Sequence, residues 1–425
     1  MFKRTIIASA VLLATSTAWA ASTGNDAYVT QFGDTNKATV NQVVSSVDNR
    51  ADIYQEGENN EALTTQENTG SSVANTSQVG TSNSGVVLQS GNTNLSTATI
   101  DTNGSRNRAS VTQQIDNGSA TATINQGAAG SDANDNSATI GQNDADQASS
   151  VINQLSNGNT ATIDNYWSDF AEATVTQQGD GGHTATVFQV ASDGANAEVT
   201  QEGAGQTATV NQNTGNYGLA AAEGTSASVV QRGELNTALV LQFDQNNVAE
   251  VTQVAERGQY TLTQRGSADN QGNRAVGYQA GTSETATVAQ TGNRNYADTY
   301  QDGSGNTTEV AQTGDDNYAY AGQYGSNSSV TLTQEGDGNF ASGVTSGGDD
   351  NIATVSQTGD RHFAVTGAVG QGNEVTVTQT GLDNAAYASG GGTNNTVTVT
   401  QSDSGNYAFA NSSGTGNQIL VTQGQ

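Results

Sequence analysis

A short motif recurs along the whole chain and leaves few folds open to it. Residues 28–42 read YVTQFGDTNKATVNQ, and the same residue types return in the same order in residues 295–306 and 351–362. Aligned on its glutamine, the motif can be placed 34 times between Gln31 and Gln423, mostly at steps of 11 or 12 residues. A unit of this length is too short for a strand followed by a helix, so each unit is predicted to hold one strand and one turn.

The spacing inside one unit supports this prediction. In residues 36–42, NKATVNQ, every second residue belongs to the motif, and a period of two is typical of a strand. Residues 33–36, GDTN, have turn chemistry, because glycine permits unusual backbone angles and Asn or Asp bonds to nearby backbone groups. The chain has no proline, which would remove a hydrogen bond from a sheet. In one less regular unit, the alignment puts the glutamine position at Ser346.

A longer period indicates how the strands pack. The two inward residues before the glutamine position alternate between bulky and small at each unit. The bulky pairs are Val330/Leu332, Val375/Val377, Val397/Val399 and Ile419/Val421, and the small pairs are Ala319/Ala321, Ala386/Ala388 and Ala408/Ala410. This alternation suits two facing sheets, so we predict an all-β fold: an amyloid-like cross-β solenoid of about 17 two-stranded coils, each of about 22 residues.

The inward amide side chains have a role in such a stack. A buried amide without a partner costs several kcal/mol, but amides stacked in successive coils can bond to the copies above and below. One ladder is predicted through the glutamines and others through the turn asparagines. The first members are Gln31, Gln55 and Gln78 for the glutamines, and Asn36, Asn60, Asn295 and Asn317 for the asparagines.

One outward column of aromatic residues recurs at steps of 22 or 23, with Ala385 interrupting it. Its members are Tyr296, Tyr318, Phe340, Phe363 and Tyr407. Stacked rings would shield the backbone and stiffen the coils, which is the interpretation we prefer. The alternative is an aromatic strip for lateral association or adhesion.

Residues 1–20 have the features of a secretory signal. Lys3 and Arg4 precede a short apolar run, and residues 18–20, AWA, form a small-x-small cleavage site. The predicted mature chain, residues 21–425, is a single repeat domain. The apolar run falls well short of the roughly 20 residues needed to span a bilayer. No later segment is apolar enough, so no integral membrane segment is predicted after signal removal.

Charge and composition exclude one class of partner. The formal net charge is −29, and without the signal the chain keeps 10 basic and 41 acidic residues. Nucleic acid is therefore not an expected partner, because phosphate binding needs clustered Lys and Arg. The chain has no cysteine, so the ladders must do what disulfides do in many exported proteins.

The spacing Gln-x-Gly-x-x-Asn-x-Ala-x-x-x-Gln, as in residues 31–42, resembles the curlin repeat of curli fibre subunits. It recurs in residues 177–189, 290–301 and 301–312, and the likeness extends over essentially the whole mature chain. The resemblance implies an extracellular fibre subunit that polymerises as functional amyloid in biofilm matrix, for surface adhesion. It also implies that motif Gln, Gly and Asn residues form ladders and turns. The usual subunit has about five repeats, so this chain is identified as a long member.

The candidate residues for self-assembly follow from the ladders and from this resemblance. They are Gln31, Gly33, Asn36, Gln42, Gln55, Gly57, Asn60, Gln177, Gln189, Gln201, Gln290, Gly292, Asn295, Gln301, Gly303, Asn306, Gln312, Gly314, Asn317, Gln379, Gln401 and Gln423.

The partners are likewise those that the resemblance implies. The main partner is the chain itself, in a homopolymeric fibre. A membrane-bound nucleator, an outer-membrane secretion channel and periplasmic chaperones complete the set, and the expected location is the extracellular cell surface. The chain ends inside a repeat at residues 423–425 without an obvious cap, so coil-on-coil stacking between molecules is expected.

An enzyme is not expected, and no cofactor or metal is predicted. His183 and His362 lie far apart and occupy the position where the motif has Asn, which predicts turn residues. No Gly-x-Ser-x-Gly nucleophile motif is present. The alternative function is a monomeric secreted β-solenoid that serves as an adhesin or binds calcium or ice. The chain lacks the Gly-Gly-x-Gly-x-Asp calcium repeat, and its outward Thr-x-Thr pairs are interrupted along the chain.

Overall fold

The computed structural model describes residues 23–127, 133–213, 225–266 and 271–424. The predicted signal, residues 1–20, lies outside the described residues. The described residues form strands and turns with no helix, and the chain divides into two compact units, residues 1–223 and 224–425. The units share one architecture.

The first unit contains sixteen strands among its described residues. They are β1 (Asp26–Asp34), β2 (Lys37–Val43), β3 (Arg50–Glu58), β4 (Glu61–Glu67), β5 (Val73–Thr81), β6 (Ser84–Ser90), β7 (Thr97–Ser105), β8 (Arg108–Gln114), β9 (Thr121–Gln126), β10 (Ser137–Asn143), β11 (Ser149–Gln154), β12 (Thr160–Tyr166), β13 (Glu172–Gly181), β14 (Thr184–Val190), β15 (Asn196–Ala204) and β16 (Thr207–Asn213).

The second unit contains eighteen strands among its described residues. They are β17 (Ser226–Glu234), β18 (Thr237–Phe243), β19 (Val248–Glu256), β20 (Gln259–Arg265), β21 (Arg274–Thr282), β22 (Thr285–Thr291), β23 (Tyr296–Ser304), β24 (Thr307–Thr313), β25 (Tyr318–Ser326), β26 (Ser329–Glu335), β27 (Phe340–Asp349), β28 (Ile352–Asp360), β29 (Phe363–Gln371), β30 (Glu374–Leu382), β31 (Ala385–Thr393), β32 (Thr396–Gln401), β33 (Tyr407–Thr415) and β34 (Gln418–Gln423).

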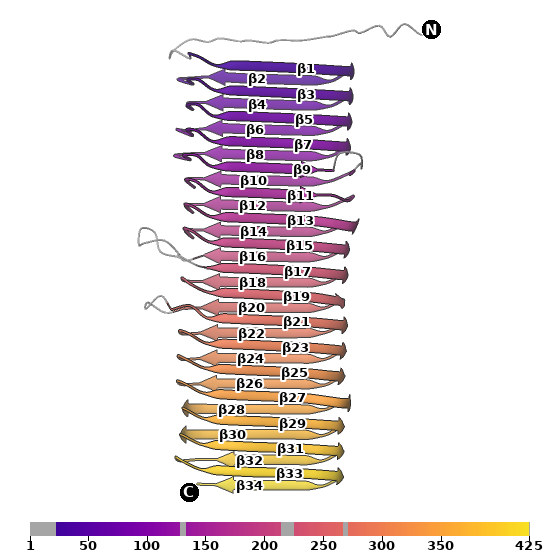
Figure 1. The fold of residues 1–425 in the computed structure, drawn as a ribbon, viewed down its shortest axis with the longest axis vertical. Helices are drawn as coiled ribbons and strands as arrows, with labels where there is room; N and C mark the ends of the chain where they lie inside the picture. Colours follow the sequence, from indigo (N-terminus) through magenta and orange to yellow (C-terminus); the bar gives the residue numbers. More distant parts are fainter. Residues whose placement is uncertain (1–22, 128–132, 214–224, 267–270, 425) are drawn as a thin grey trace, which may run out of the picture. The chain divides into compact units, whose positions relative to one another are not determined.

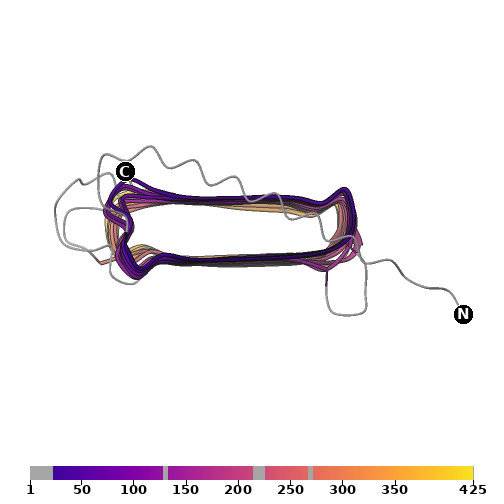
Figure 2. The ribbon, with the colours of Figure 1, turned by 90° about the horizontal axis from the view of Figure 1, so that it is seen from above.

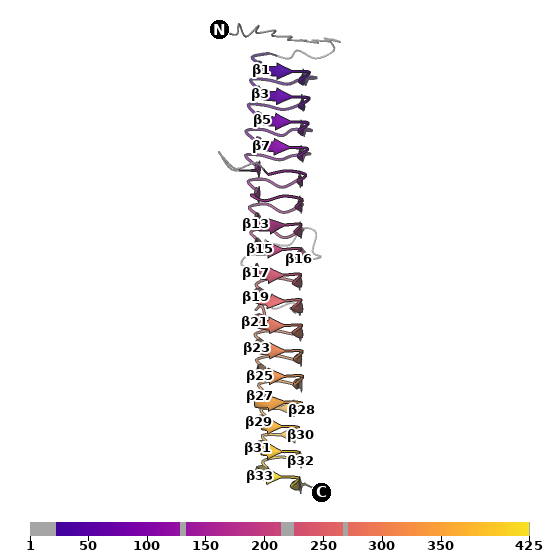
Figure 3. The same ribbon diagram turned by 90° about the vertical axis from the view of Figure 1, so that its right-hand side faces the viewer.

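Each coil consists of one odd-numbered and one even-numbered strand that face each other. Seen from above, the two strands form the long sides of a flattened loop and the turns form its short ends (Figure 2). Within each unit, odd-numbered strands pair in parallel with odd-numbered strands, and even-numbered with even-numbered (Figures 1 and 3). The structure confirms the predicted all-β solenoid of two-stranded coils, with eight such pairs in the first unit and nine in the second.

The strands stack in register, as a repeat of constant length requires. Gln31 pairs with Gln55, and Gln42 pairs with Gln66. One placement of the motif was wrong: the residue that pairs with Gln323 is Thr345, which is buried, and not Ser346. The pairing of β25 with β27 becomes irregular just after this position, because β27 holds an extra residue near its end. Counting back from the turn therefore misplaces the inward residue by one.

The predicted alternation of bulky and small inward residues is confirmed in the C-terminal coils. Val330 and Leu332 lie on β26, and the smaller Ala319 and Ala321 lie on β25; all four are fully buried. The two rows meet across the thin core, since a Cβ added to Gly343 of β27 would lie 2.8 Å from Val330 Cγ1. The small row therefore makes room for the bulky one, which is how a core of so few atoms is filled.

One pair of positions reverses this pattern. Tyr260 of β20 occupies a position where neighbouring coils have alanine, and it is the largest fully buried side chain among the described residues. Gly277 of β21 stands where Val251 lies one coil earlier, and a Cβ there would come within 2.2 Å of the Tyr260 ring. The Tyr260 hydroxyl shares a hydrogen bond of 2.9 Å with Thr299 Oγ1.

Candidate self-assembly site: amide ladders and an aromatic column

The glutamines of the even-numbered strands form an unbroken ladder in the second unit. In each step, the Nε2 atom of one glutamine donates to the Oε1 atom of the next, at distances between 2.7 and 3.0 Å. The ladder runs through Gln242, Gln264, Gln290, Gln312, Gln334, Gln357, Gln379, Gln401 and Gln423. All of these side chains are buried except Gln423, which is partly exposed.

Each ladder amide also ties the two sheets together. Gln290 Nε2 donates to the carbonyl of Arg274 at 3.0 Å, and Gln312 Nε2 donates to the carbonyl of Tyr296 at 3.0 Å. These carbonyls belong to the facing strand of the same coil. Both N–H groups and the carbonyl of the amide are therefore used, which offsets the cost of burying it.

The odd-numbered strands carry a second ladder with the same direction. Its steps measure 2.6 to 3.0 Å. The bonded runs are Gln31–Gln55–Gln78 and Gln126–Gln154–Gln177–Gln201 in the first unit, and Gln231–Gln253–Gln279–Gln301–Gln323 in the second. The first unit has an even-strand ladder as well, through Gln42, Gln66, Gln89, Gln113 and Gln142, and again from Gln189 to Gln212.

The ladders are interrupted where a shorter side chain takes the glutamine position. Thr102 follows Gln78 and Asn165 follows Gln142, and neither side chain reaches the next coil. As a result, the Oε1 atoms of Gln126 and Gln189 are buried without a partner. Ser150 on the facing strand repairs part of one gap, because its hydroxyl contacts both Gln142 Nε2 and Asn165 Nδ2 at 3.1 Å.

The turn asparagines form ladders at the edges of the coils. The Oδ1 atom of Asn295 accepts the backbone N–H of Asn317 at 3.0 Å, and its Nδ2 atom donates to the carbonyl of Gly314 at 2.7 Å. Asn36 makes the same two bonds with Asn60 and Gly57, each of 2.9 Å. Asn306 likewise accepts the backbone N–H of the next coil and donates to its turn glycine.

The turn glycines are required by this close stacking. Gly314 has a φ of 113°, and a Cβ there would lie 2.1 Å from the carbonyl oxygen of Gly336 in the next coil. Any side chain would therefore push the coils apart. The predicted turn residues Gly33, Gly57, Gly292 and Gly303 also have positive φ, and a Cβ at each would lie too close to the carbonyl oxygen of the matching glycine in the next coil.

Both histidines belong to the asparagine ladders. His183 Nδ1 accepts the backbone N–H of Gln206 at 3.3 Å, and His183 Nε2 lies 2.9 Å from the carbonyl of Gln178. His362 makes the matching contacts with Asn384 and Thr358. This pattern fits a neutral ring with its proton on Nε2, and burial lowers the pKa of both rings. The structure places them as turn residues, as the motif predicted.

A buried glutamate also sits in this ladder, and the sequence interpretation missed it. Glu284 occupies an asparagine position, is fully buried, and accepts the backbone N–H of Asn306 at 3.0 Å and its Nδ2 at 3.3 Å. Burial raises the pKa of Glu284 to about 7. The signal was available, because alignment on the motif puts an acid where an amide is usual.

The aromatic column stacks as regularly as the ladders. Tyr296 and Tyr318 have ring centroids 5.0 Å apart, Tyr318 and Phe340 5.1 Å, and Phe340 and Phe363 4.8 Å, with planes within 15° of parallel. At Ala385 the column passes to Tyr387, which lies between Phe363 and Tyr407 at 5.3 and 6.1 Å.

A second column on the same sheet was not predicted. It consists of Tyr278, Tyr300 and Tyr324, with successive centroids 5.0 Å apart. Steps of 22 and 24 residues between these tyrosines could have revealed it.

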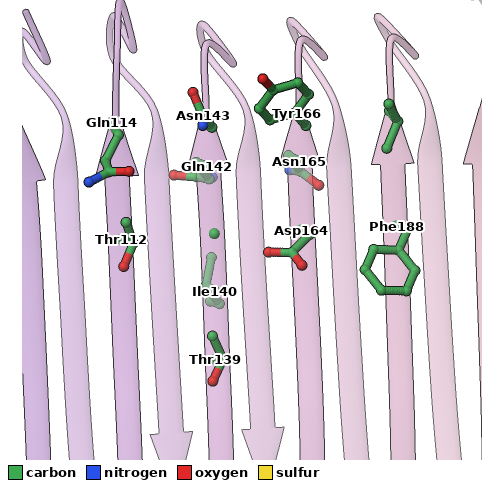
Figure 4. A pocket seen from close by; sticks show the side chains of 12 residues that line it. Thr112, Gln114, Thr139, Ile140, Gln142, Asn143, Asp164, Asn165, Tyr166 and Phe188 are labelled. Atoms are coloured by element: carbon green, nitrogen blue, oxygen red, sulfur yellow. The ribbon is translucent and has the colours of Figure 1, made fainter. Parts of the chain in front are cut away.

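One hollow of about 440 Å³ lies on the outward face of even-numbered strands in the first unit (Figure 4). It opens beside Gly141, where a Cβ would meet the carboxylate of Asp164 at 2.3 Å. Asp164, Tyr166 and Phe188 line it, and burial raises the pKa of the Asp164 carboxyl. Its lining residues supply one carboxyl, one phenol and the hydroxyls of Thr112 and Thr139.

The described residues offer neither a metal-binding cluster nor a membrane-spanning helix. No group of three or more His, Cys, Asp or Glu is placed to hold a metal ion within residues 23–127, 133–213, 225–266 and 271–424. None of these residues forms a helix long and apolar enough to cross a membrane.

Comparison with known protein families identifies a repeat in the segments that carry the glutamine ladders. The family model of the Curlin associated repeat matches residues 80–114, 292–325, 303–336 and 348–381. Both units contain curlin repeats. The matched curlin repeats contain ladder glutamines of both units, and curlin repeats mark a structural family rather than an enzyme family. A search of curated proteins found no match.

Proposed function

We propose that this chain is a subunit of an extracellular curli-like amyloid fibre, in which coils of successive molecules stack end to end. The observation that carries the proposal is the direction of the ladders. Every glutamine step donates from the earlier coil to the later one, as from Gln290 to Gln312. A coil at the edge of any stack therefore offers the same donors or acceptors that interior coils already use.

Addition of a second molecule would continue these ladders without new chemistry. An exposed strand edge is a template for pairing, and each added coil satisfies one set of backbone and side-chain groups. Because all ladder bonds point the same way, the fibre would be polar, with molecules joined head to tail. The curlin repeats supply the same expectation from family resemblance.

The cellular setting of the proposal follows from the resemblance and from residues 1–20. The chain would be exported by its signal and leave through an outer-membrane channel. Periplasmic chaperones would keep it unfolded until exit, and a membrane-bound nucleator would start growth. The fibre would then serve biofilm matrix and surface adhesion.

Fibre diffraction and seeding on the chain from Ala21 onward test the proposal. We expect a meridional reflection near 4.7 Å, and growth that accelerates when preformed fibres are added. A chain that stays monomeric, rich in sheet and with one sharp melting transition, would contradict the fibre and leave the solenoid intact.

A matched pair of variants ties the growth to the ladder. Gln312→Leu leaves the Nε2 of Gln290 and the Oε1 of Gln334 without their partners, at a cost of about 1–3 kcal/mol. We expect several-fold slower seeded growth. Thr313→Leu, one residue further and exposed, should grow like the parent. Equal growth rates for the two variants would show that the glutamine ladder does not contribute to fibre growth.

The structure favours ice binding as the second candidate function. The register aligns outward threonines of β26, β28, β30 and β32 in one row, from Thr331 through Thr354 and Thr376 to Thr398. Glu309 and Leu420 end the row on either side. A monomer that shows thermal hysteresis, abolished by Thr376→Lys, would support this alternative instead.

A further inference from the structure

One face of the second unit carries no charge. It is formed by the outward side chains of residues 318–324, 340–346, 363–369, 385–391 and 407–413, on the odd-numbered strands β25 to β33; we call it the aromatic face. None of the residues in these five segments is charged, in a chain whose formal net charge is −29. An uncharged apolar surface of this extent is typical of an interaction site.

The surroundings of the aromatic face differ sharply from it. The opposite sheet of the same coils carries outward Glu335 and Glu374, and the turns carry carboxylates such as Asp316, Asp337 and Asp383. Acidic groups therefore border the aromatic face at the turns, and on the opposite sheet they flank the row of outward threonines. Two copies of this chain would repel each other wherever these carboxylates approach one another, and the aromatic face itself contributes no such repulsion.

The shape of the aromatic face is complementary to that of the same face on a second copy. Large rings fill seven of the ten places at the first two outward positions of the five strands, and small residues fill seven of the ten places at the last two, where Tyr324, Val344 and Val369 are the bulky exceptions. The rings are Tyr318, Tyr320, Phe340, Phe363, Tyr387, Tyr407 and Phe409, and the small residues are Gly322, Ser346, Gly367, Ser389, Gly391, Asn411 and Ser413. Tyr407 and Phe409 are the most open of the rings, with exposed fractions of 60% and 68%.

We propose that the aromatic face pairs with the aromatic face of a second copy of this chain. A twofold axis parallel to the stack would bring the strands of the two faces together antiparallel. The ring side of one copy then lies over the small-residue side of the other, as in a dry interface between facing sheets. This pairing is lateral, and it does not depend on the end-to-end stacking proposed above.

The size of the face suits such a pair. Five strands about 4.8 Å apart, each seven residues long at about 3.3 Å per residue, cover about 550 Å² on each copy. Two copies would bury about 1,100 Å², which is near the lower limit for a specific interface. Where copies also stack end to end, every added molecule extends the paired surface.

Single cysteines test the pairing cleanly, because the chain has none of its own. Ser342→Cys places a thiol on the aromatic face, and Ser356→Cys places one on the opposite sheet, each half-buried. A short bismaleimide, to which each thiol adds without any oxidant, should join two Ser342→Cys chains at least ten times faster than two Ser356→Cys chains. Equal yields from the two variants, or no covalent dimer from either, would overturn the proposal.

Charge insertion separates pairing from axial growth. Tyr320→Lys, Val365→Lys and Tyr387→Lys together should lower lateral association at least tenfold in sedimentation and give narrower filaments, while growth on seeds persists. The matched control, Thr331→Lys, Thr354→Lys and Thr376→Lys, adds the same charge to the opposite sheet and should leave both readouts unchanged. Equal loss in both triple variants would overturn the pairing. So would a monodisperse parent chain that binds microcrystalline cellulose through the aromatic face.

Discussion

At the scale of the residue, the motif accepts whatever group reproduces the hydrogen bonds of an amide. His183 and His362 do so with one ring nitrogen that accepts and one that faces a carbonyl. Gln206 reproduces the donor half with a longer side chain, donating from Nε2 to the carbonyl of Glu202 at 2.9 Å. Glu284 reproduces only the acceptor half, and its charge is buried.

Glu284 therefore predicts a dependence of stability on pH. Its pKa rises from an ordinary value near 4.5 to about 7 because burial disfavours the charged form. Between these values the folded chain holds a proton that the unfolded chain releases, so stability falls as pH rises through about 4.5 to 7. Glu284→Gln should remove this loss and raise the melting temperature more at pH 8 than at pH 4.5.

The measurement is thermal melting of the parent and the variant at both pH values, with Glu309→Gln on the outward face as control. A glutamine at position 284 can also donate to the carbonyl of Ala280, as Gln206 does to that of Glu202. A gain of the same size at both pH values would show that the carboxyl does not titrate in this window.

At the scale of the element, the inward side chains that a strand can hold depend on the strand that faces it across the core. Small rows face bulky rows in the C-terminal coils, and Tyr260 of β20 is accommodated only because β21 has Gly277 and β23 has Thr299. Neither strand would show this by itself. The stacking of identical positions fixes which way side chains point, and the facing strand decides how large they can be.

The pair Tyr260 and Gly277 predicts strong coupling between two substitutions. Tyr260→Ala should cost about 3–5 kcal/mol by opening a cavity. Gly277→Val should cost more than an ordinary overpacked site, because its Cβ alone would come within 2.2 Å of the tyrosine ring. Together they restore the alanine and valine of neighbouring coils, so the double variant should be more stable than either single one. Denaturant unfolding of the four proteins measures the coupling, and additive effects would contradict it.

At the scale of the whole molecule, charge opposes the association that the ladders favour. The formal net charge of −29 spreads over turns and outward positions. Because 41 acidic residues outnumber 12 basic ones, ion pairs such as Arg361 with Asp383, at 2.7 Å, can neutralise only a minority of the carboxylates. Mutual repulsion opposes the association of single chains, and salt screens it.

Seeded growth should therefore accelerate several-fold between about 0.01 and 0.2 M sodium chloride, as the Debye length falls from about 30 Å to less than 10 Å. Light scattering with a fixed amount of seed measures the rate. Calcium chloride at equal ionic strength is the control for specific ion binding and should give a similar rate. Growth that does not respond to salt would show that charge repulsion does not limit association.

The repeat alone determined the fold class, the two-stranded coil, the ladders' positions and the aromatic column. It could do so because inward and outward positions follow from a period of two, and stacking follows from a constant coil length. The turn glycines and both histidines could also be predicted from the repeat, since each place in the motif indicates which backbone conformation or hydrogen bond is required there.

Only the tertiary structure decided the features that depend on the neighbouring coil or the facing strand. These include the ladder gaps after Gln78 and Gln142, the buried Thr345 in place of Ser346, and Tyr387 filling the column at Ala385. The uncharged aromatic face also emerged only when five strands were brought side by side. The physical reason is that the partners of these side chains lie about one coil away in sequence. Packing between coils, and not local periodicity, therefore determines whether a side chain contacts its partner.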